Sequence, residues 1–147
     1  MIIETLSEFF ERDLLKLKEE IASYSNETAI WKIEGDIRNT AGNLALHLVG
    51  NINHFIGAVL GKTGYIRERE REFSDSDVPR IKLIQDIDTT IAMAKTTFSR
   101  MDDSVLYQNY PIEKHGKTVT VEHMLLHLLA HLNYHLGQVN YHRRLIG

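Results

Sequence analysis

The chain of 147 residues contains no cysteine. Disulfide bonds, thiolate metal ligands and a cysteine nucleophile are therefore excluded, and any thiol chemistry would need a thiol supplied from outside. Long hydrophobic runs are missing as well, so no segment of the sequence has the length of a membrane span. The first residues, MIIETLSEFFERD, lack the basic start of a signal peptide. We therefore expect a cytoplasmic protein that has no membrane partner.

A large excess of charge of either sign is also absent. The net charge is −3 at pH 7, which gives no sign of a basic surface for nucleic acid. Apolar residues make up 43% and charged residues 25% of the chain, as in ordinary soluble globular proteins. The length suits one domain with a continuous core. We predict a single domain, residues 1–147, that does not bind nucleic acid.

Four segments repeat apolar residues at steps of three and four, the period of an amphipathic helix. They run from Ile2 to Tyr24, from Asn39 or Thr40 to Leu60, from Pro79 to Met101, and from Thr120 to Leu145. Outside these four segments, almost no stretch has the alternating pattern of a strand. The stretches 107–112 and 117–119 could form a small hairpin, with His115 exposed in its turn. The pattern predicts an all-α fold, most simply a four-helix bundle.

The second of these helices has no charged residue between Ala41 and Gly61. Its apolar side is opposed by a polar and small-residue face: Asn43, His47, Gly50, Asn51, His54 and Gly57. A face in contact with water would usually carry Lys or Glu, so this face is expected to be enclosed. Enclosed polar groups need partners, because an unsatisfied one costs about 1–3 kcal/mol. A metal site with a polar pocket around it would provide them.

The last helix carries four histidines spaced by four, His123, His127, His131 and His135. Each step of four advances about 40° around a helix and about 6 Å along it, so at most one adjacent pair can chelate an ion. His135 lies roughly 55° and His131 roughly 95° from the centre of the apolar stripe, whereas the two earlier histidines turn towards solvent. Spacing alone leaves two interpretations open, a metal-binding pair and a solvated or hydrogen-bonded histidine face. A third ligand would have to come from elsewhere.

A mixed-charge stretch, GYIREREREF, links the second and third helices. In it Arg67, Arg69 and Arg71 alternate with glutamates. The arginines could hold a substrate carboxylate or phosphate. The pattern favours the plainer interpretation, a solvated loop or helical turn of mixed charge.

Two motifs resemble a known family. The histidine within NLALHLVGNINHFIG and the HxxxH followed by Gly-Gln in HLNYHLGQ resemble the DinB-like, or DinB/YfiT, superfamily of helical metalloproteins. The stretches HLVGNINHFI and REREREF further resemble an uncharacterised branch of it. The resemblance covers the whole chain. It implies a four-helix bundle with up-down-down-up order and a divalent metal on His47, His131 and His135.

The same resemblance suggests residues around the metal. His54 lies about 10 Å along the helix from His47, too far to join the same ion, and is expected to line the pocket. Asn51 and Gln138 lie one turn from His47 and His135, so they are candidates for the pocket or for contacts to the ligands. Three imidazoles without a carboxylate or thiolate leave metal positions open, as in catalytic sites. Imidazole ligands suit zinc or nickel, with iron as a further candidate.

The superfamily includes S-transferases and isomerases that use small thiols such as bacillithiol or mycothiol. The resemblance therefore implies a metal-dependent enzyme, and we predict a small-thiol-dependent S-transferase that acts on a small-molecule substrate. A low-molecular-weight thiol would be its co-substrate. A metal-dependent hydrolase and a non-catalytic, stress-related metal-binding module are the alternatives. By analogy with the family we also expect a homodimer.

Overall fold

The computed structural model describes all 147 residues, and helices dominate it. Its α-helices are α1 (Ile2–Ala22), α2 (Ala41–Ile52), α3 (Arg69–Ser74), α4 (Arg80–Ser99) and α5 (Val121–Ile146). The 3₁₀ segments are η1 (Glu27–Trp31) and η3 (Asp103–Tyr107), and the π-helical segment η2 (Asn53–Ala58) continues α2. The chain forms no named strand, so the all-α prediction is confirmed. None of the helices combines the length and apolarity needed to cross a membrane.

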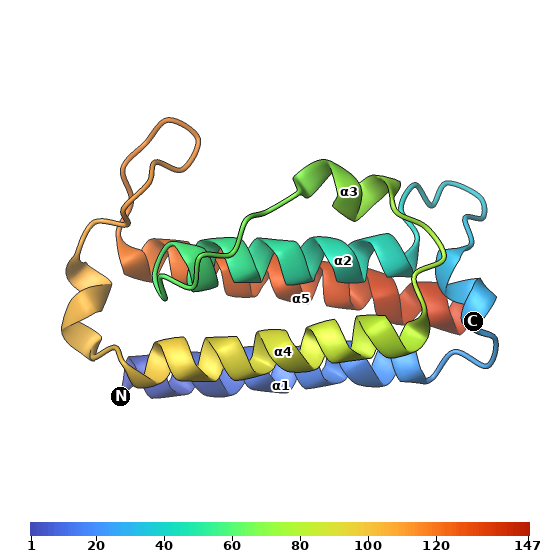
Figure 1. Ribbon diagram of the computed structural model, residues 1–147, viewed down its shortest axis with the longest axis horizontal. Coiled ribbons are helices and arrows are strands. Elements are labelled where there is room, and N and C mark those ends of the chain that lie inside the picture. Colours follow the sequence, from blue (N-terminus) through green and yellow to red (C-terminus); the bar gives the residue numbers. More distant parts are fainter.

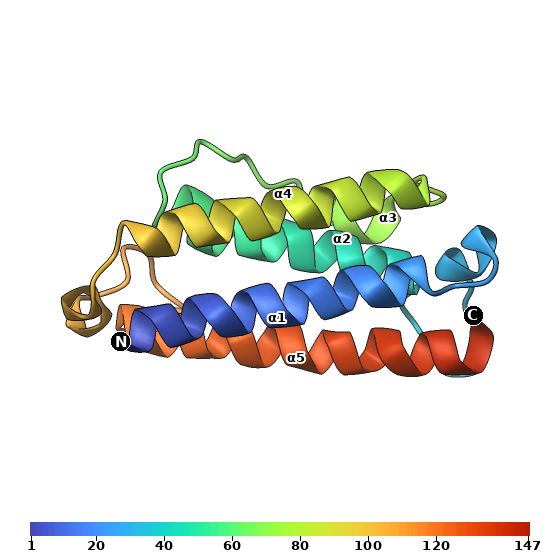
Figure 2. The same ribbon diagram turned by 90° about the horizontal axis from the view of Figure 1, so that it is seen from below.

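The four long helices form a bundle of two layers. In Figure 1, α2 and α5 form the upper layer, α1 and α4 the lower one, and α3 lies above α2. The helices α1 and α5 run from left to right in this view, whereas α2 and α4 run from right to left. Figure 2 shows from below that α1 lies beside both α4 and α5. The helices that carry the candidate ligands, α2 and α5, are therefore antiparallel neighbours.

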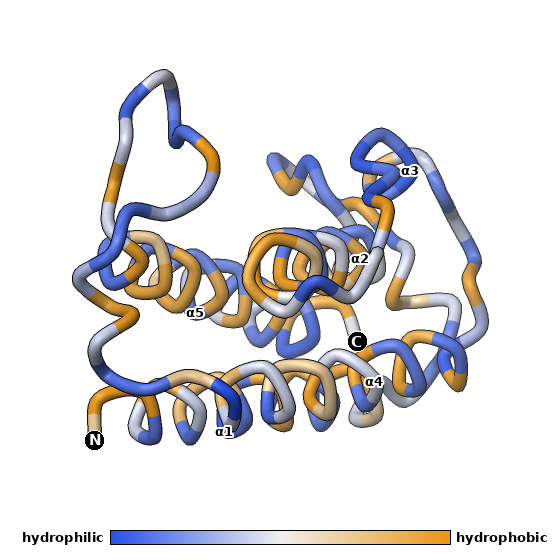
Figure 3. Tube along the Cα trace, turned by 60° about the vertical axis from the view of Figure 1, so that its left-hand side comes forward, coloured by the Kyte–Doolittle hydropathy of each residue, from blue (hydrophilic) through white to orange (hydrophobic).

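One apolar core holds the bundle together. It consists of 29 buried apolar residues, most of them contributed by the four long helices. Figure 3 shows the hydrophobic residues recurring along each long helix, while α3 is mostly hydrophilic. Burying one Leu or Ile side chain contributes about 1.5–3 kcal/mol, so this shared core accounts for most of the driving force. The polar side of each helix is then free for other contacts.

Side-chain caps define where the two histidine-bearing helices begin. The Thr40 hydroxyl oxygen accepts a hydrogen bond from the backbone N–H of Asn43, and Thr120 does the same for His123. Such caps satisfy a helix N–H that has no partner inside the helix. The apolar pattern placed the start of the second helix at Asn39 or Thr40 and that of the last helix at Thr120, and the caps lie at these positions.

Two local features differ from the sequence-based picture. The second helix ends in π geometry, with a hydrogen bond from Val59 N to His54 O at 3.1 Å. The segment 107–120 doubles back as a hairpin-shaped loop, hereafter the hairpin loop, which is closed by two isolated bridges and not by a continuous ladder. Its base is tied to η2, the continuation of α2, because the Tyr110 hydroxyl donates to Phe55 O at 2.6 Å. This bond holds the loop next to the face of α2 that carries His47.

Candidate metal centre

Three histidines meet between α2 and α5. The Nε2 atoms of His47 and His131 lie 3.1 Å apart, and those of His131 and His135 lie 3.2 Å apart. The candidate ligand atoms of all three residues fall within 4.8 Å of one another. In a tetrahedral zinc site with bonds of about 2.0–2.1 Å, neighbouring nitrogens are about 3.3 Å apart. The spacing of this cluster, hereafter the histidine cluster, therefore suits a single ion.

The remaining histidines lie outside the histidine cluster. His123 and His127 are exposed, as their place on α5 predicted, although the His127 ring lies 6.4 Å from the His131 ring. His115 is exposed in the turn of the hairpin loop and has a positive φ of 50°. The His54 ring packs edge-on against Phe55 with 4.7 Å between the ring centroids.

Hydrogen bonds orient two of the imidazoles in the cluster. His47 Nδ1 lies 3.0 Å from Glu72 Oε1, and His135 Nδ1 lies 2.6 Å from Gln138 Oε1. Both oxygens accept hydrogen bonds, so both Nδ1 atoms carry the proton and donate it. The Nε2 atoms of these rings are then left with free lone pairs. Metal-binding histidines are commonly held in this tautomer by an oxygen acceptor on the other nitrogen.

Glu72 is a buried carboxylate with a buried counter-charge. Its exposed fraction is 6%. Arg67 donates to it from two nitrogens, Nε to Oε2 at 2.8 Å and Nη2 to Oε1 at 2.9 Å. An unpaired buried carboxylate would be strongly destabilising, whereas this two-point pair neutralises it. Arg67 therefore neutralises Glu72 and holds it in place beside His47.

The uncharged face of α2 is the surface on which α3 packs. Asn43 Nδ2 donates to the backbone oxygens of Glu72 at 3.0 Å and of Asp75 at 2.8 Å. At Gly50 an added Cβ would lie 1.8 Å from Glu72 Oε2, so only glycine leaves room for the carboxylate. Asn43, His47, Gly50 and Asn51 are all buried. The expectation that this face is enclosed is confirmed.

The structure corrects the interpretation of the mixed-charge stretch as a solvated segment. Glu72 is buried and Arg67 is largely buried, and both belong to the surroundings of His47. Arg71 does fit the solvated description, because it is exposed and pairs with Glu68 and Asp75. The alternation of charges could not separate these residues. The one indirect sign that part of this stretch is buried was the charge-free face of the second helix, because such a face has to be covered by another element.

The surroundings of two ligand imidazoles, His47 and His131, favour their neutral form. Burial, and to a smaller extent the neighbouring His135 and His47, lower the pKa of His131 to about 4. Burial also lowers the pKa of His47, against the opposing effect of Glu72. A neutral imidazole keeps its lone pair for a metal ion, so protons compete poorly for this cluster near pH 7.

Unsatisfied polar atoms gather at the same place. Three buried side-chain polar atoms lack a hydrogen-bond partner, and two of them are His131 Nδ1 and Asn51 Oδ1. Asn51 lies one turn beyond His47 and has an exposed fraction of 8%. Buried polar groups usually have a partner, so these two atoms mark a place where the protein alone does not complete its contacts. Together with the donor set, they fit a divalent metal and its ligands.

A cavity of about 350 Å³ borders the histidine cluster. It reaches from α2 and α5 to the start of α3 and to the hairpin loop. Its lining consists of His47, Asn51, Phe55, Arg67, Arg69, Glu113, Lys114, His115, Met124, His127, Leu128 and His131. We call it the cluster cavity. Of the three residues predicted around the metal, Asn51 lines this cavity, whereas His54 and Gln138 do not.

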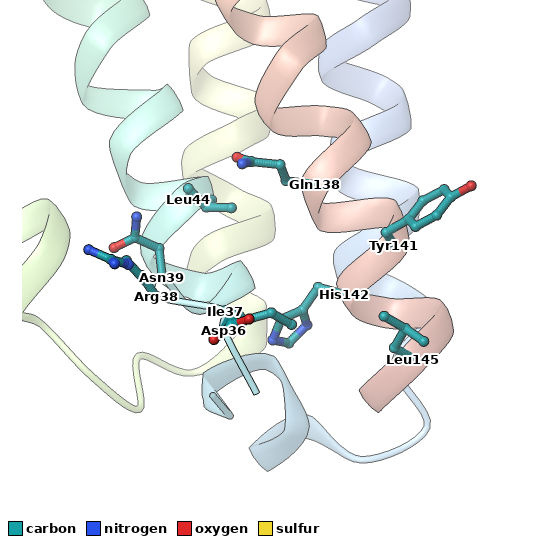
Figure 4. Close-up of a pocket in the computed structure, with 9 residues that line it drawn as sticks. All are labelled: Asp36, Ile37, Arg38, Asn39, Leu44, Gln138, Tyr141, His142 and Leu145. Atoms are coloured by element: carbon teal, nitrogen blue, oxygen red, sulfur yellow. The ribbon is translucent and has the colours of Figure 1, made fainter. Parts of the chain in front are cut away.

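Gln138 instead lines a second cavity of about 550 Å³ near the C-terminal end of α5. In Figure 4 its side chain points across this cavity towards Leu44, and Tyr141 points away. His142 also borders it, but its ring nitrogens are engaged by the Tyr24 hydroxyl at 2.6 Å and by Lys32 O at 2.8 Å. His142 is therefore a structural histidine, and Gln138 is the residue that links this cavity to the histidine cluster.

Fold and site together define an all-helical bundle with a candidate three-histidine metal centre bordered by a cavity. The chain belongs to the family described as protein of unknown function (DUF1572), whose sequence model matches residues 3–147. A comparison with curated proteins gave no match.

Proposed function

We propose that this protein is a metal-dependent enzyme of the DinB-like superfamily that transfers a small thiol to an electrophile. The observation that carries the proposal is the convergence of three Nε2 donors, without a protein carboxylate or thiolate among them, beside a cavity. Structural metal sites are usually closed by four protein ligands, whereas catalytic sites keep positions open. The family match agrees with the resemblance in covering almost the whole chain.

The arrangement of the bundle supports the same assignment. The resemblance to the DinB-like superfamily implies an up-down-down-up order of the four long helices. The directions of α1, α2, α4 and α5 in Figure 1 agree with that order. We accordingly propose the DinB/YfiT-like bundle as the fold, with α3 as an addition that covers α2.

His47, His131 and His135 would hold the ion, with zinc or nickel ahead of iron. A divalent ion bound there would supply Lewis acidity that lowers the pKa of a thiol or of water. Glu72 and Gln138 keep the lone pairs of His47 and His135 directed at the shared point. The lining of the cluster cavity would limit water around the reacting atoms and orient the small-molecule substrate.

In the transfer reaction the thiol loses its proton, the new carbon–sulfur bond forms, and the leaving group departs from the electrophile. His127 is our candidate for the proton acceptor. It lines the cavity beside His131, and burial lowers its pKa, with Lys114 lowering it further. It is therefore neutral near pH 7 and able to accept a proton.

Hydrolysis is the second candidate, and Asn51 favours it. Its unpartnered Oδ1 lies one turn from His47 and would accept a hydrogen bond from a nucleophilic water. In the third, non-catalytic alternative, the metal would only connect α2 to α5. These three functions make different demands on the cavity, so one set of assays separates them.

The test incubates metal-loaded protein with bacillithiol, glutathione and simpler thiols, each with a panel of electrophiles, and uses His131→Ala as the control. Conjugation that is faster with the parent protein than with His131→Ala supports the transferase. Turnover of esters and amides without any thiol would replace it with the hydrolase. If neither reaction exceeds the control while metal strongly raises the melting temperature, the non-catalytic module is the better account.

A further inference from the structure

The cluster cavity has an excess of positive charge that the bundle does not compensate. Arg69 and Lys114 both line it, and neither forms an ion pair with an acidic side chain within 4.0 Å. Arg67 also lines it but is neutralised by Glu72. Glu113 is the one carboxylate in the lining and offsets one of the two remaining cations. A bound divalent ion would add two further positive charges.

The two free cations come from different elements. Arg69 opens α3, and its guanidinium lies 5.4 Å from the ring centre of Phe73. The Phe73 ring in turn lies 4.8 Å from the His47 ring, so Arg69 is separated from the ligand by one aromatic ring. Lys114 comes from the hairpin loop, where its backbone pairs with Lys117. The cavity thus has a cation on each of two elements that cover the bundle.

The inner part of the cavity presents a different kind of group. Asn51 lies beside the ligands and is more than nine-tenths buried, and its Oδ1 has no hydrogen-bond partner within the protein. A buried acceptor without a partner is destabilising, and a ligand that donates a hydrogen bond would relieve this. The cavity therefore combines a cationic rim with an inner polar group that lacks a partner.

We propose that the cluster cavity binds a small anionic molecule, whose carboxylate or tetrahedral oxyanion is held by Arg69 and Lys114. Its other end reaches the histidine cluster beside Asn51. This inference rests on the proposed function, and it specifies the substrate class: the transferred thiol itself carries the acidic group. Cationic and neutral thiols would lack the contacts at the rim.

Cobalt-loaded protein provides a binding assay, because a thiolate on cobalt(II) gives a charge-transfer absorption band. The probes share a two-carbon spacer: 2-mercaptoethanol is neutral, 3-mercaptopropionate carries a carboxylate, 2-mercaptoethanesulfonate carries a tetrahedral anion, and cysteamine is cationic. 6-Mercaptohexanoate and 6-mercaptohexanol repeat the comparison with a longer reach. Each thiol is titrated into the parent protein, the double variant Arg69→Gln/Lys114→Gln, and Arg71→Gln. Arg71 is the matched control, because it is exposed and outside the cavity lining.

We expect at least one anionic thiol to bind the double variant about tenfold more weakly than the parent. The neutral and cationic thiols should bind both proteins alike, and Arg71→Gln should behave as the parent. The thiol whose affinity falls more in the double variant, 3-mercaptopropionate or 2-mercaptoethanesulfonate, identifies the preferred anionic group. Equal affinities of parent and double variant for every anionic thiol would overturn the proposal. Comparing each thiol with itself across proteins removes differences in intrinsic thiol acidity.

The experiments distinguish failure of the proposed transferase from failure of the proposed anion site. If no thiol changes the cobalt spectrum, the proposed transferase is wrong, but the anion site is still measurable with ligands that have no thiol. Calorimetric titration with hexanoate and hexyl phosphate would then decide it. Binding to the parent that is lost in the double variant supports the anion site, and equal heats in both proteins refute it.

Discussion

At the residue scale, histidines of the same helix, α5, lie in different surroundings: some belong to the histidine cluster and others are exposed. His131 and His135 have their Nε2 atoms 3.2 Å apart and facing His47, whereas His123 is exposed two turns earlier. We predict that His131→Ala and His135→Ala each lower metal affinity by more than about 100-fold, since loss of a supporting contact alone costs about 10–100-fold. His123→Ala should retain the metal. Elemental analysis of protein purified without an affinity tag measures this, and variants with parental metal content would disprove the assignment.

Glu72 permits a second prediction at this scale. It accepts the Nδ1–H of His47 and is neutralised by Arg67, so Glu72→Gln would weaken the orientation of the ligand and leave Arg67 without its counter-charge. We expect metal affinity to fall by about 10–100-fold. Glu70→Gln on the same short helix is the control, because Glu70 is exposed. Competition with a chromogenic chelator gives the affinities, and indistinguishable values for the two variants would remove Glu72 from the site.

At the scale of elements, the packing of α3 on α2 depends on the missing side chain at Gly50. A Cβ at Gly50 would meet Glu72 Oε2 at 1.8 Å, whereas nothing lies within 4 Å of a Cβ at Gly137 of α5. Overpacking costs about 1–3 kcal/mol, which exceeds the 0.5–1 kcal/mol or so that alanine gains over glycine in a helix. Gly50→Ala should therefore lower the free energy of unfolding, and Gly137→Ala should raise it. Urea unfolding of both metal-free variants tests the pair.

The same substitution also separates stability from metal binding. If α3 is displaced, Glu72 leaves His47, and metal affinity should fall in Gly50→Ala but not in Gly137→Ala. A Gly50→Ala protein that is as stable as the parent and binds metal equally well would show that α3 does not depend on this close approach.

Stability of the whole molecule should depend on pH through its buried histidines. The pKa of His131 is about 4 in the folded chain, and an unfolded histidine titrates near 6.5. Between these values the unfolded chain binds a proton that the native protein does not, so the free energy of unfolding decreases as pH falls from about 6.5 to about 4. Above pH 6.5 the imidazole is neutral in both states, so this group no longer changes the free energy of unfolding with pH. Urea unfolding of metal-free protein in this window should show a steeper loss for the parent than for His131→Gln, and parallel curves would contradict the linkage.

Association of the whole molecule is a further prediction. The outer side of α5 leaves Leu126, Tyr134 and Tyr141 exposed by 51%, 65% and 64%. Burying such surface against a second copy would be favourable, and the family analogy also suggests a homodimer. Light scattering at micromolar concentration should then give twice the mass of the chain. A monomer at that concentration would end the prediction.

The sequence by itself determined the helices and part of the cluster. Apolar residues at three- and four-residue steps indicated all four long helices, and Thr40 and Thr120 marked helix starts. These are local signals, because a helix's period and its first unpaired N–H depend on nearby residues. The spacing of His131 and His135 likewise places them one turn apart wherever the helix lies. The partner His47 came from the family resemblance, since His54 lies on nearly the same face of the helix.

Only the tertiary structure decided which residues surround the cluster. Glu72 and Arg67 looked like members of a solvated charge run, and they became buried because α3 packs onto the charge-free face of α2. Lys114 reaches the cluster cavity because Tyr110 ties the hairpin loop to η2, the continuation of α2. A sequence pattern shows which side of a helix is apolar. It does not show which other element will pack onto the remaining side of that helix. That choice belongs to the packing of the whole chain, where buried charges must find partners at the same time as the core closes.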